Sequence, residues 1–240
     1  MQVKVFDTTT ELDSYAAGLF AAALKAKPDS TLGLATGSTP IGIYEKMIEL
    51  YEQGELSFKY ATTFNLDEYV GLSPDHEQSY ARFMNRHLFA HVDLPAGRSH
   101  LPSGTAANLE AECAGYDRML EEQSVDIQLL GLGHNGHIGF NEPDRALQGG
   151  THIVELEQAT REANARFFDS LDEVPTQAIT MGVGSILKAD AILLVVKGAD
   201  KAGIVKQALQ GPITTEVPAS LLQTHKNVTV LVDREAGRLL

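Results

Sequence analysis

Polar side chains that can move protons are concentrated in one short segment of the sequence. The segment Ile127–Pro143, IQLLGLGHNGHIGFNEP, begins as an apolar run that predicts a strand and continues as a glycine-rich loop. Within nine residues this loop carries His134, Asn135, His137, Asn141 and Glu142. An imidazole ordinarily titrates near neutral pH and can both take and give a proton. We therefore interpret His137 as an acid–base group whose ring is oriented by Asn135 or Glu142.

Two other interpretations of this loop stay open. A metal site would have to use two histidines and one glutamate on an irregular backbone, without cysteine. That set is a poor match to the ligands of zinc and other transition metals, so we expect no metal. A histidine can also be a hydrogen-bonded structural residue, and that description fits one of the two histidines more easily than both.

A second segment, LGLATGSTPIGIYEKM, joins an apolar run to a helical pattern through a tight turn. Pro40 suits the first position of a helix. Glycine lets the backbone approach a ligand, and the free amides at a helix start favour an anion such as phosphate. The same residue types also form ordinary helix caps. The candidate phosphate-binding residues of this turn are Thr36, Gly37, Ser38 and Thr39.

Two adjacent acids, Asp67 and Glu68, follow a third apolar run in TTFNLDEYVGL. We expect them at the carboxyl edge of a parallel sheet, where ligands collect. Adjacent side chains rarely face the same way, so one carboxylate is expected to enter the cleft while the other turns to a backbone group or a cation. A polar turn with two solvated acids is the competing description.

The elements that must position these side chains alternate along the chain. Short β-rich runs are separated by helical patterns, which predicts an α/β fold. We expect a three-layer, Rossmann-like domain with a mainly parallel central sheet of about seven strands and helices on both faces. The predicted strands are Val3–Phe6, Thr31–Ala35, Ala61–Phe64, Ile127–Leu132, Ala178–Met181, Ala191–Val196 and Val228–Val232. A sheet-packed helix is predicted from the stripe Leu12, Tyr15, Ala16, Leu19, Phe20, Ala23 and Leu24.

No linker, repeat or low-complexity tract interrupts the sequence, so we predict a single domain over residues 1–240. Within it, the segment Thr151–Pro175 contains Arg161, Arg166, Phe167 and Phe168 between sheet elements. Its length and content suit a lid that brings Arg166 to a bound anion and excludes water. A packed pair of surface helices is the alternative.

Charge and composition exclude several classes of protein. The chain has 19 basic and 32 acidic residues, a formal net charge of −13, which disfavours extended contacts with nucleic acid or an anionic membrane. The single cysteine, Cys113, lies on an apolar helical face and is expected to be a small buried hydrophobe. No apolar run is long enough to span a bilayer and no export signal is recognisable, so we expect a cytoplasmic protein.

Five motifs occur in a fixed order along essentially the whole chain: LATGSTP, FNLDEYVGL, GLGHNGHIGFNEP, ARFFD and GADKA. In this combination the sequence resembles the glucosamine-6-phosphate deaminase family, also called glucosamine/galactosamine-6-phosphate isomerases. The resemblance implies conversion of glucosamine 6-phosphate to fructose 6-phosphate and ammonia, with no cofactor. The related 6-phosphogluconolactonases share the phosphate loop and the glycine–histidine portion but typically lack the DEYVGL and GFNEP continuations, so they rank second.

The resemblance also implies roles for individual residues. Asp67 would be the base that carries a proton from carbon 2 of the sugar to carbon 1. His137 would open the sugar ring, with Glu142 and the residue at position 135 completing its proton relay. Two cations would join the turn at the phosphate, which answers the need of an acidic protein for local positive charge. The implied phosphate ligands are Thr36, Gly37, Ser38, Thr39, Arg166 and Lys201.

The sequence departs from the family pattern in two places. Position 135 is Asn where many members have Asp. We expect Asn135 to accept a hydrogen bond from the His137 ring and fix its tautomer without adding charge. His152 and Val154 stand where large allosteric members carry basic residues. We therefore expect no activation by an amino-sugar phosphate and a small assembly, a monomer or a small homo-oligomer.

A non-catalytic domain that senses a sugar phosphate is a further alternative. Such a domain needs the phosphate loop but not Asp67, His137 and Glu142 together, and no helix-turn-helix segment or basic face accompanies the loops here. We therefore expect an enzyme that acts on a small sugar phosphate, with no nucleic-acid or membrane partner.

Overall fold

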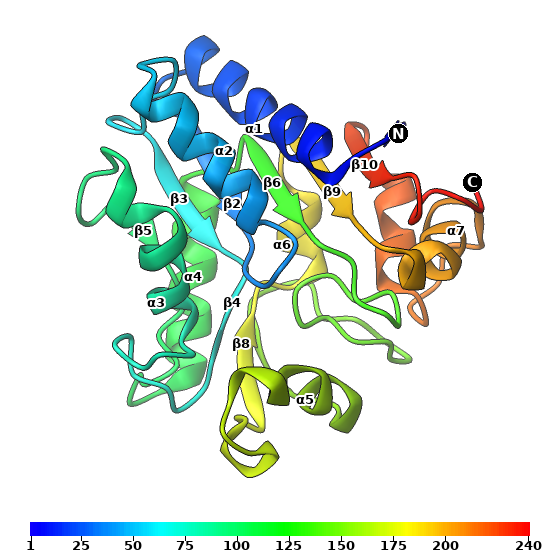
Figure 1. Ribbon diagram of the computed structural model, residues 1–240. Helices are drawn as coiled ribbons and strands as arrows, with labels where there is room; N and C mark the ends of the chain where they lie inside the picture. The colour runs from blue at the N-terminus through cyan, green and yellow to red at the C-terminus, as the bar shows by residue number, and fades with distance from the viewer.

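The main sheet has seven strands, and every pairing within it is parallel. The computed structural model describes the backbone of residues 1–240 and all side chains except those of Ala159, Ala163 and Phe167. From edge to edge the strands are β1 (Gln2–Phe6), β10 (Val228–Asp233), β9 (Ala191–Val196), β6 (Ile127–Leu130), β2 (Thr31–Leu34), β3 (Thr62–Asn65) and β5 (Ser99–His100) (Figure 1). The predicted mainly parallel sheet is confirmed.

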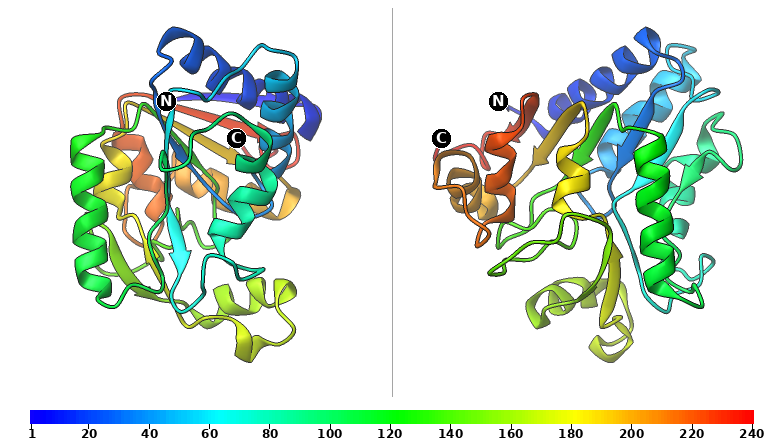
Figure 2. Two further views of the ribbon diagram at one scale, coloured as in Figure 1. Left: turned by 90° about the vertical axis from the view of Figure 1, so that its left-hand side faces the viewer. Right: turned by 180° about the vertical axis from the view of Figure 1, so that it is seen from behind.

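Helices cover both faces of this sheet, as predicted. Helices α1 (Thr9–Ala26) and α2 (Ile41–Glu52) lie side by side on one face, and α4 (Leu109–Glu122) and α6 (Val183–Leu187) lie on the other (Figure 2). The remaining helices are α3 (Tyr80–His87), α5 (Gln158–Asn164) and α7 (Ala202–Gln210). Short 3-10 turns are η1 (Phe89–His91), η2 (Ala165–Phe167), η3 (Leu171–Glu173), η4 (Ala199–Lys201) and η5 (Pro218–Thr224).

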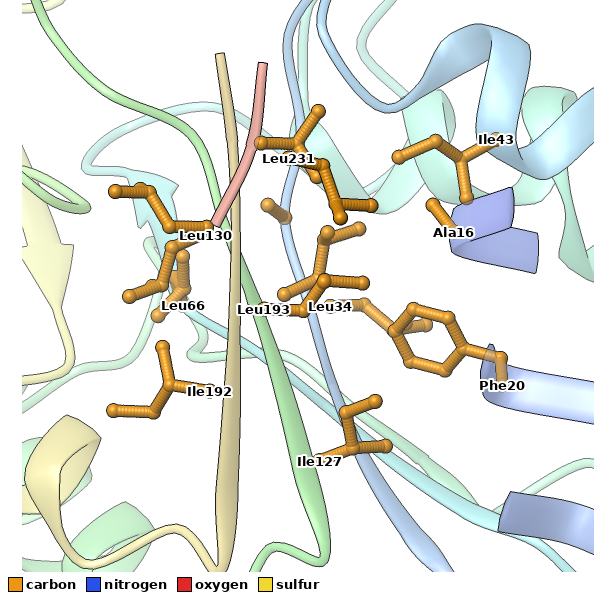
Figure 3. Close-up of a cluster of buried hydrophobic side chains, with 14 of the residues drawn as sticks. Ala16, Phe20, Leu34, Ile43, Leu66, Ile127, Leu130, Ile192, Leu193 and Leu231 are labelled. Atoms are coloured by element: carbon orange, nitrogen blue, oxygen red, sulfur yellow. The ribbon is translucent and has the colours of Figure 1, made fainter. Parts of the chain in front are cut away.

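The strands at the centre of the sheet are apolar because both of their faces are covered. All residues from Ile192 to Val196 in β9 are buried. On one face, Ala16 and Phe20 of α1 lie close to Leu34 of β2 (Figure 3). Cys113 is free and buried, which confirms its prediction as a small core residue.

The buried face of α1 differs from the predicted stripe at one edge. Leu12, Ala16 and Phe20 are buried as expected, but Tyr15 is exposed. The phenol of Tyr15 packs at the surface, with its ring 5.3 Å from that of Phe6. A tyrosine can cover apolar surface while its hydroxyl stays in water, so apolar periodicity alone overstated its burial.

A second, smaller sheet lies beside the first and corrects one predicted strand. Strand β4 (Asp67–Tyr69) pairs with β8 (Gln177–Thr180), which pairs with β7 (His152–Glu155), and both pairings are antiparallel. The run Ala178–Met181 was predicted to belong to the parallel sheet, and that prediction is wrong. An apolar run specifies a buried strand but neither its partner nor its direction. The short strand β5 takes the seventh place instead.

The segment predicted as a lid forms one projecting unit. Residues 151–175 include β7, α5, η2 and η3, and α5 lies at the far end of the small sheet, away from the main sheet (Figure 1). The segment is therefore not a packed pair of surface helices. Whether it moves as a lid stays a prediction, and the side chain of Phe167 lies outside the described residues. None of the helices in the described part of the chain has the length and apolarity needed to cross a lipid bilayer.

Candidate active site

Two loops meet where the strand order reverses. Strand β2 lies between β6 and β3, so the loops that leave the carboxyl ends of β2 and β6 are neighbours. Such a switch point is the usual ligand site of an open α/β sheet. The loop after β2, residues 35–40, is the candidate phosphate loop. The loop after β6, residues 131–143, contains the histidines and is called the catalytic loop below.

The backbone of the phosphate loop is tightly held. Gly37 has a φ of 90°, a conformation that favours glycine. The Tyr44 hydroxyl, on α2, donates to the Ala35 carbonyl at 2.6 Å. Helix α2 begins at Ile41, directly after Pro40. The loop therefore has the position and the backbone geometry expected of a phosphate site, although phosphate binding by residues 36–39 stays a prediction.

A buried ion pair that the sequence did not reveal lies beneath the phosphate loop. The Lys197 ammonium donates to the Thr39 carbonyl at 2.9 Å and to the Asp13 carboxylate at 2.6 Å. Gly42 leaves room for Asp13, since a Cβ there would lie 2.3 Å from its Oδ2 atom. Burial raises the pKa of Asp13, and the Lys197 ammonium opposes that shift. The available signal was Asp13 itself, a charged residue on the buried face of α1 beside Leu12.

The two cations expected at the phosphate occupy different parts of the structure. Lys201 ends η4, and its ammonium donates to the carbonyl of Leu132 in the catalytic loop at 2.8 Å. Burial lowers the pKa of Lys201. Lys201 thus lies beside the catalytic loop at the carboxyl edge of the main sheet. Arg166 lies in η2 of the lid segment with an exposed side chain, and its contact with a phosphate stays a prediction.

The catalytic loop brings His137, Glu142 and Asn135 together. Glu142 Oε2 lies 3.1 Å from His137 Nδ1 and accepts from Asn135 Nδ2 at 2.5 Å. Its other oxygen, Oε1, accepts from the Thr160 hydroxyl at 2.6 Å. Burial opposes ionisation of Glu142, but the hydrogen bonds from His137, Thr160 and Asn135 outweigh it and lower the pKa of this carboxyl. Glu142 is therefore ionised at neutral pH.

An ionised Glu142 fixes the tautomer of His137. A carboxylate only accepts hydrogen bonds, so Nδ1 of the ring must donate, which leaves Nε2 with a free lone pair. The ring packs against Gly133, where an added Cβ would lie 2.3 Å from Nε2. The His137 side chain keeps 23% exposure. The neutral His137 ring in this tautomer therefore has its proton acceptor at Nε2.

Asn135 acts differently from the prediction. It was expected to accept from the His137 ring. Instead its Oδ1 accepts from the His137 backbone amide at 3.2 Å, and its Nδ2 donates to Glu142. The short turn from Asn135 to His137 places the amide oxygen over the backbone rather than over the ring. Asn135 therefore orients the loop and Glu142, and Glu142 orients the ring.

The other two polar residues of the loop have structural contacts. His134 is exposed and lies 2.6 Å from the Asp200 carboxylate through Nε2. Asn141 is buried and donates to the carbonyls of Ile138 and Met181, both at 2.9 Å. One histidine of the pair is thus outside the relay, which the sequence had left open. Within the described residues, no three His, Cys, Asp or Glu side chains gather where they could hold a metal ion.

The two adjacent acids in β4 have opposite environments, as predicted. Glu68 accepts from the backbone amides of Tyr69, Tyr80 and Ala81, each at 2.9 Å, and so caps α3. Asp67 is 6% exposed and faces the catalytic loop, since a Cβ on Gly139 would lie 3.6 Å from its Oδ2 atom. Burial, aided by the charge of Glu68, raises the pKa of Asp67 to about 8. Of the two acids, Asp67 is thus the one that faces the catalytic loop, whereas Glu68 is engaged by backbone amides.

A cavity of about 350 Å³ opens next to the phosphate loop. Its walls come from the phosphate loop, α3 with the residues before it, and the lid segment, and they include Gly37, Ser38, Tyr80, Arg86 and Phe168. Asp67 and His137 are not among its lining residues.

The fold and the site together define an α/β protein with a glycine-containing loop and a histidine–glutamate pair at the switch point and a buried aspartate beside them. A family model described as glucosamine-6-phosphate isomerases/6-phosphogluconolactonase matches residues 6–231. The chain belongs to this family.

Individual relatives agree with the resemblance seen in the motifs. The chain is 50% identical to glucosamine-6-phosphate deaminases of Clostridium perfringens and Bacillus pumilus, with all of each chain covered. A solved monomeric glucosamine-6-phosphate deaminase is 48% identical, with a TM-score of 0.97 over the whole of both chains. A 6-phosphogluconolactonase from Trypanosoma brucei has a TM-score of 0.78 at 18% identity over 100% of this chain and 98% of its own, which shows a shared fold.

Proposed function

We propose that this protein converts glucosamine 6-phosphate to fructose 6-phosphate and ammonia. The observation that carries the proposal is the pairing of Asp67, buried and with a raised pKa, with a histidine whose tautomer is fixed by Glu142. A Cβ added on Gly139 would lie 3.6 Å from Asp67 Oδ2, and Gly139 is two residues from His137, so Asp67 Oδ2 lies within roughly 12 Å of the His137 Cα, a separation that one sugar phosphate can bridge. The family and its deaminase relatives support the same activity.

The residues divide the reaction into two proton transfers. His137 Nε2 takes the proton of the anomeric hydroxyl and returns it to the ring oxygen, which opens the sugar. Asp67 then takes the proton from carbon 2 and delivers it to carbon 1, which turns the amine-bearing carbon into an imine. Water adds to the imine carbon and ammonia leaves, so fructose 6-phosphate remains. Nothing in these steps calls for a cofactor or a metal.

A raised pKa suits Asp67 for the second transfer. A proton on carbon is a weak acid, so the base must bind a proton more strongly than a free aspartate does, and catalytic groups work best with a pKa near the operating pH. Ionised Asp67, whose pKa is raised to about 8, meets this requirement. The positively charged amine of the substrate would favour the ionised form when it binds.

The phosphate is assigned to residues 36–39 with Lys201 and Arg166. Free amides at the start of α2 and the Lys201 ammonium face the same edge of the sheet, and such groups hold a dianion together. Arg166 would arrive with the lid segment. This division leaves the reactive end of the sugar toward Asp67 and His137.

The direct test is ammonia release from glucosamine 6-phosphate by the purified protein. We expect turnover by the wild type and a fall in kcat of about 10³-fold or more in Asp67→Asn, because the proton acceptor is lost. The exposed Asp75→Asn is the matched control and should keep full activity. Hydrolysis of 6-phosphogluconolactone without ammonia would favour the related lactonase activity. Binding of the sugar phosphate without any turnover would favour a sensor domain.

We also propose that the protein acts as a monomer or a small homo-oligomer in the cytoplasm, without activation by an amino-sugar phosphate. The monomeric deaminase with a TM-score of 0.97 supports the first part, and its metabolic relatives support the location. Sedimentation with and without N-acetylglucosamine 6-phosphate, together with substrate saturation curves, tests both. A larger assembly or a clear gain in substrate affinity would contradict them.

A further inference from the structure

One hydroxyl on the lid segment reaches the proton relay. Thr160 lies on α5 and is 9% exposed, and its Oγ1 donates to Glu142 Oε1 at 2.6 Å. Helix α5 belongs to the projecting unit of residues 151–175, whereas Glu142 belongs to the catalytic loop of the main sheet (Figure 1). The contact therefore joins two parts of the molecule that are separate in the fold.

The two oxygens of Glu142 serve different partners. Oε2 takes both hydrogen bonds from the catalytic loop itself, from His137 and Asn135. Oε1 takes the bond from the lid segment. If α5 moved away, Oε1 would lose a donor in a largely buried place. Losing a hydrogen bond to a buried charged group is costly, so the position of α5 and the state of Glu142 depend on each other.

Internal hydrogen bonds tie α5 to the later part of the lid segment. Arg161, next to Thr160, donates from its guanidinium to the carbonyls of Leu171 and Val174, both at 3.1 Å. These bonds close the segment on itself. A displacement of the segment would therefore carry the Thr160 hydroxyl with it rather than leave it on Glu142.

We propose that Thr160 is a positioning residue that couples the lid segment to the catalytic relay of the function proposed above. With α5 packed against the loop, Thr160 holds Glu142 ionised and aligned, so His137 Nδ1 donates and Nε2 stays a base. With α5 displaced, Glu142 can rotate or take up a proton, and the ring loses its fixed tautomer. The relay is thus complete only when the segment that bears Arg166 is in place.

The charged groups around Glu142 are few. His137 faces it from the catalytic loop, Asp67 lies on the neighbouring β4, and Arg161 on α5 is turned to the carbonyls of its own segment. Thr160 and Asn135 are neutral donors. Removing the Thr160 hydroxyl therefore weakens the hold on ionised Glu142 without changing a charge, and its proton uptake moves to higher pH.

The test compares Thr160→Val, which keeps the shape but loses the donor, with Thr160→Ser, which keeps the donor. The matched control is Thr176→Val, an exposed threonine directly after the lid segment. For Thr160→Val we expect kcat to fall about 10- to 100-fold with a smaller change in KM. The acid limb of its pH–rate profile should move to higher pH. Thr160→Ser should lie within about threefold of the wild type, because it keeps the bond to the charged group.

A second measurement separates this proposal from the proposed activity. Nitrogen chemical shifts of the His137 ring in the ligand-free protein report the tautomer directly, and amide hydrogen exchange reports the protection of α5. We expect one protonated nitrogen, Nδ1, in the wild type and a mixture with faster exchange in α5 for Thr160→Val. A protein without ammonia release would overturn the activity but not these results. An unchanged tautomer and unchanged exchange in Thr160→Val, or equal impairment in Thr160→Ser, would overturn the coupling.

Discussion

The two sheets of this protein contribute to the site in opposite ways. The large parallel sheet is apolar along its strands and offers chemistry only from the loops at their ends, through the phosphate loop and the catalytic loop. The small antiparallel sheet carries its chemistry within a strand, because Asp67 and Glu68 are themselves residues of β4. Both acids are buried. Under the proposed function, the large sheet would position the substrate, while the small sheet would place a buried acid with a raised pKa beside it.

The buried charged groups of the two sheets should also differ in their effect on the free energy of unfolding, which can be measured. A buried acid without ion-pair compensation destabilises the fold once it ionises. A buried acid that caps backbone amides stabilises the fold. The ion pair of Asp13 and Lys197 beneath the phosphate loop lies between these cases, since its charges compensate each other. The four predictions below separate these situations, from the largest effect to the smallest.

The largest effect is expected from Asp67 as the pH rises. Its pKa is raised from 3.8 to about 8 in the fold, so the folded state holds a proton that the unfolded chain has released. Stability is therefore highest below about pH 4 for this group and falls as the pH rises to about 8, by on the order of 5 kcal/mol. Urea unfolding of the wild type and of Asp67→Asn across this range measures it, because the variant lacks the titration. Parallel pH curves for the two proteins would show that Asp67 is not buried as described.

Glu68, the neighbour of Asp67, should stabilise the fold through its backbone hydrogen bonds, although burial raises the pKa of this carboxyl as well. Glu68→Ala removes the acceptor of the Tyr69 amide in β4 and of the Tyr80 and Ala81 amides at the start of α3, and we expect a loss of about 4 kcal/mol of unfolding free energy. The exposed Glu77→Ala is the control and should change stability by less than about 0.5 kcal/mol. If both substitutions have the same small effect, the cap is not important and the comparison of the two acids fails.

The ion pair beneath the phosphate loop tests the large sheet. Lys197→Met leaves Asp13 buried without its partner, and we expect a loss of about 3 kcal/mol of stability together with a higher KM, because Thr39 loses its anchor. The double variant Asp13→Leu/Lys197→Met should recover most of the stability but not the affinity. Lys188→Met, which breaks an exposed pair with Glu121, is the control. Equal KM values in all four proteins would show that the pair does not position the loop.

The sequence made the loops of the large sheet predictable and left the small sheet hidden. His137, Glu142 and the turn at residues 36–39 follow strong apolar runs, so local pattern placed them at strand ends. Strand β4 has three residues, two of them acidic, and resembles a polar turn. The identity of Asp67 came from a resemblance between motifs, while its strand and its neighbour β8 came only from the structure.

Contacts between residues far apart in the sequence could not be predicted for a similar reason. Lys197 reaches Thr39 across 158 positions and Asp13 across 184, and Thr160 reaches Glu142 across 18. No periodicity of 2 or 3.6 residues encodes such pairs. Asn135 shows the same limit at short range. The sequence showed that Asn135 lies near His137 and Glu142. It did not show that Oδ1 would accept from the His137 backbone amide and Nδ2 would donate to Glu142, because these contacts depend on the geometry of the turn.

The smallest effect is expected from Asn135. It tests how the catalytic loop, which follows β6 of the large sheet, influences the protonation of His137. Asn135→Asp adds a charge next to Glu142 Oε2, which accepts from Asn135 Nδ2 at 2.5 Å. The added negative charge favours the imidazolium form of His137, so the acid limb of the pH–rate profile should move upward by about one pH unit. The two carboxylates repel, and a shared proton would reduce that shift. Asn135→Ser, which removes the amide donor to Glu142 without adding charge, is the control and should move the limb less than Asn135→Asp does. A profile that moves equally in both variants would mean that position 135 acts by orienting Glu142 alone, and charge would have no part in it.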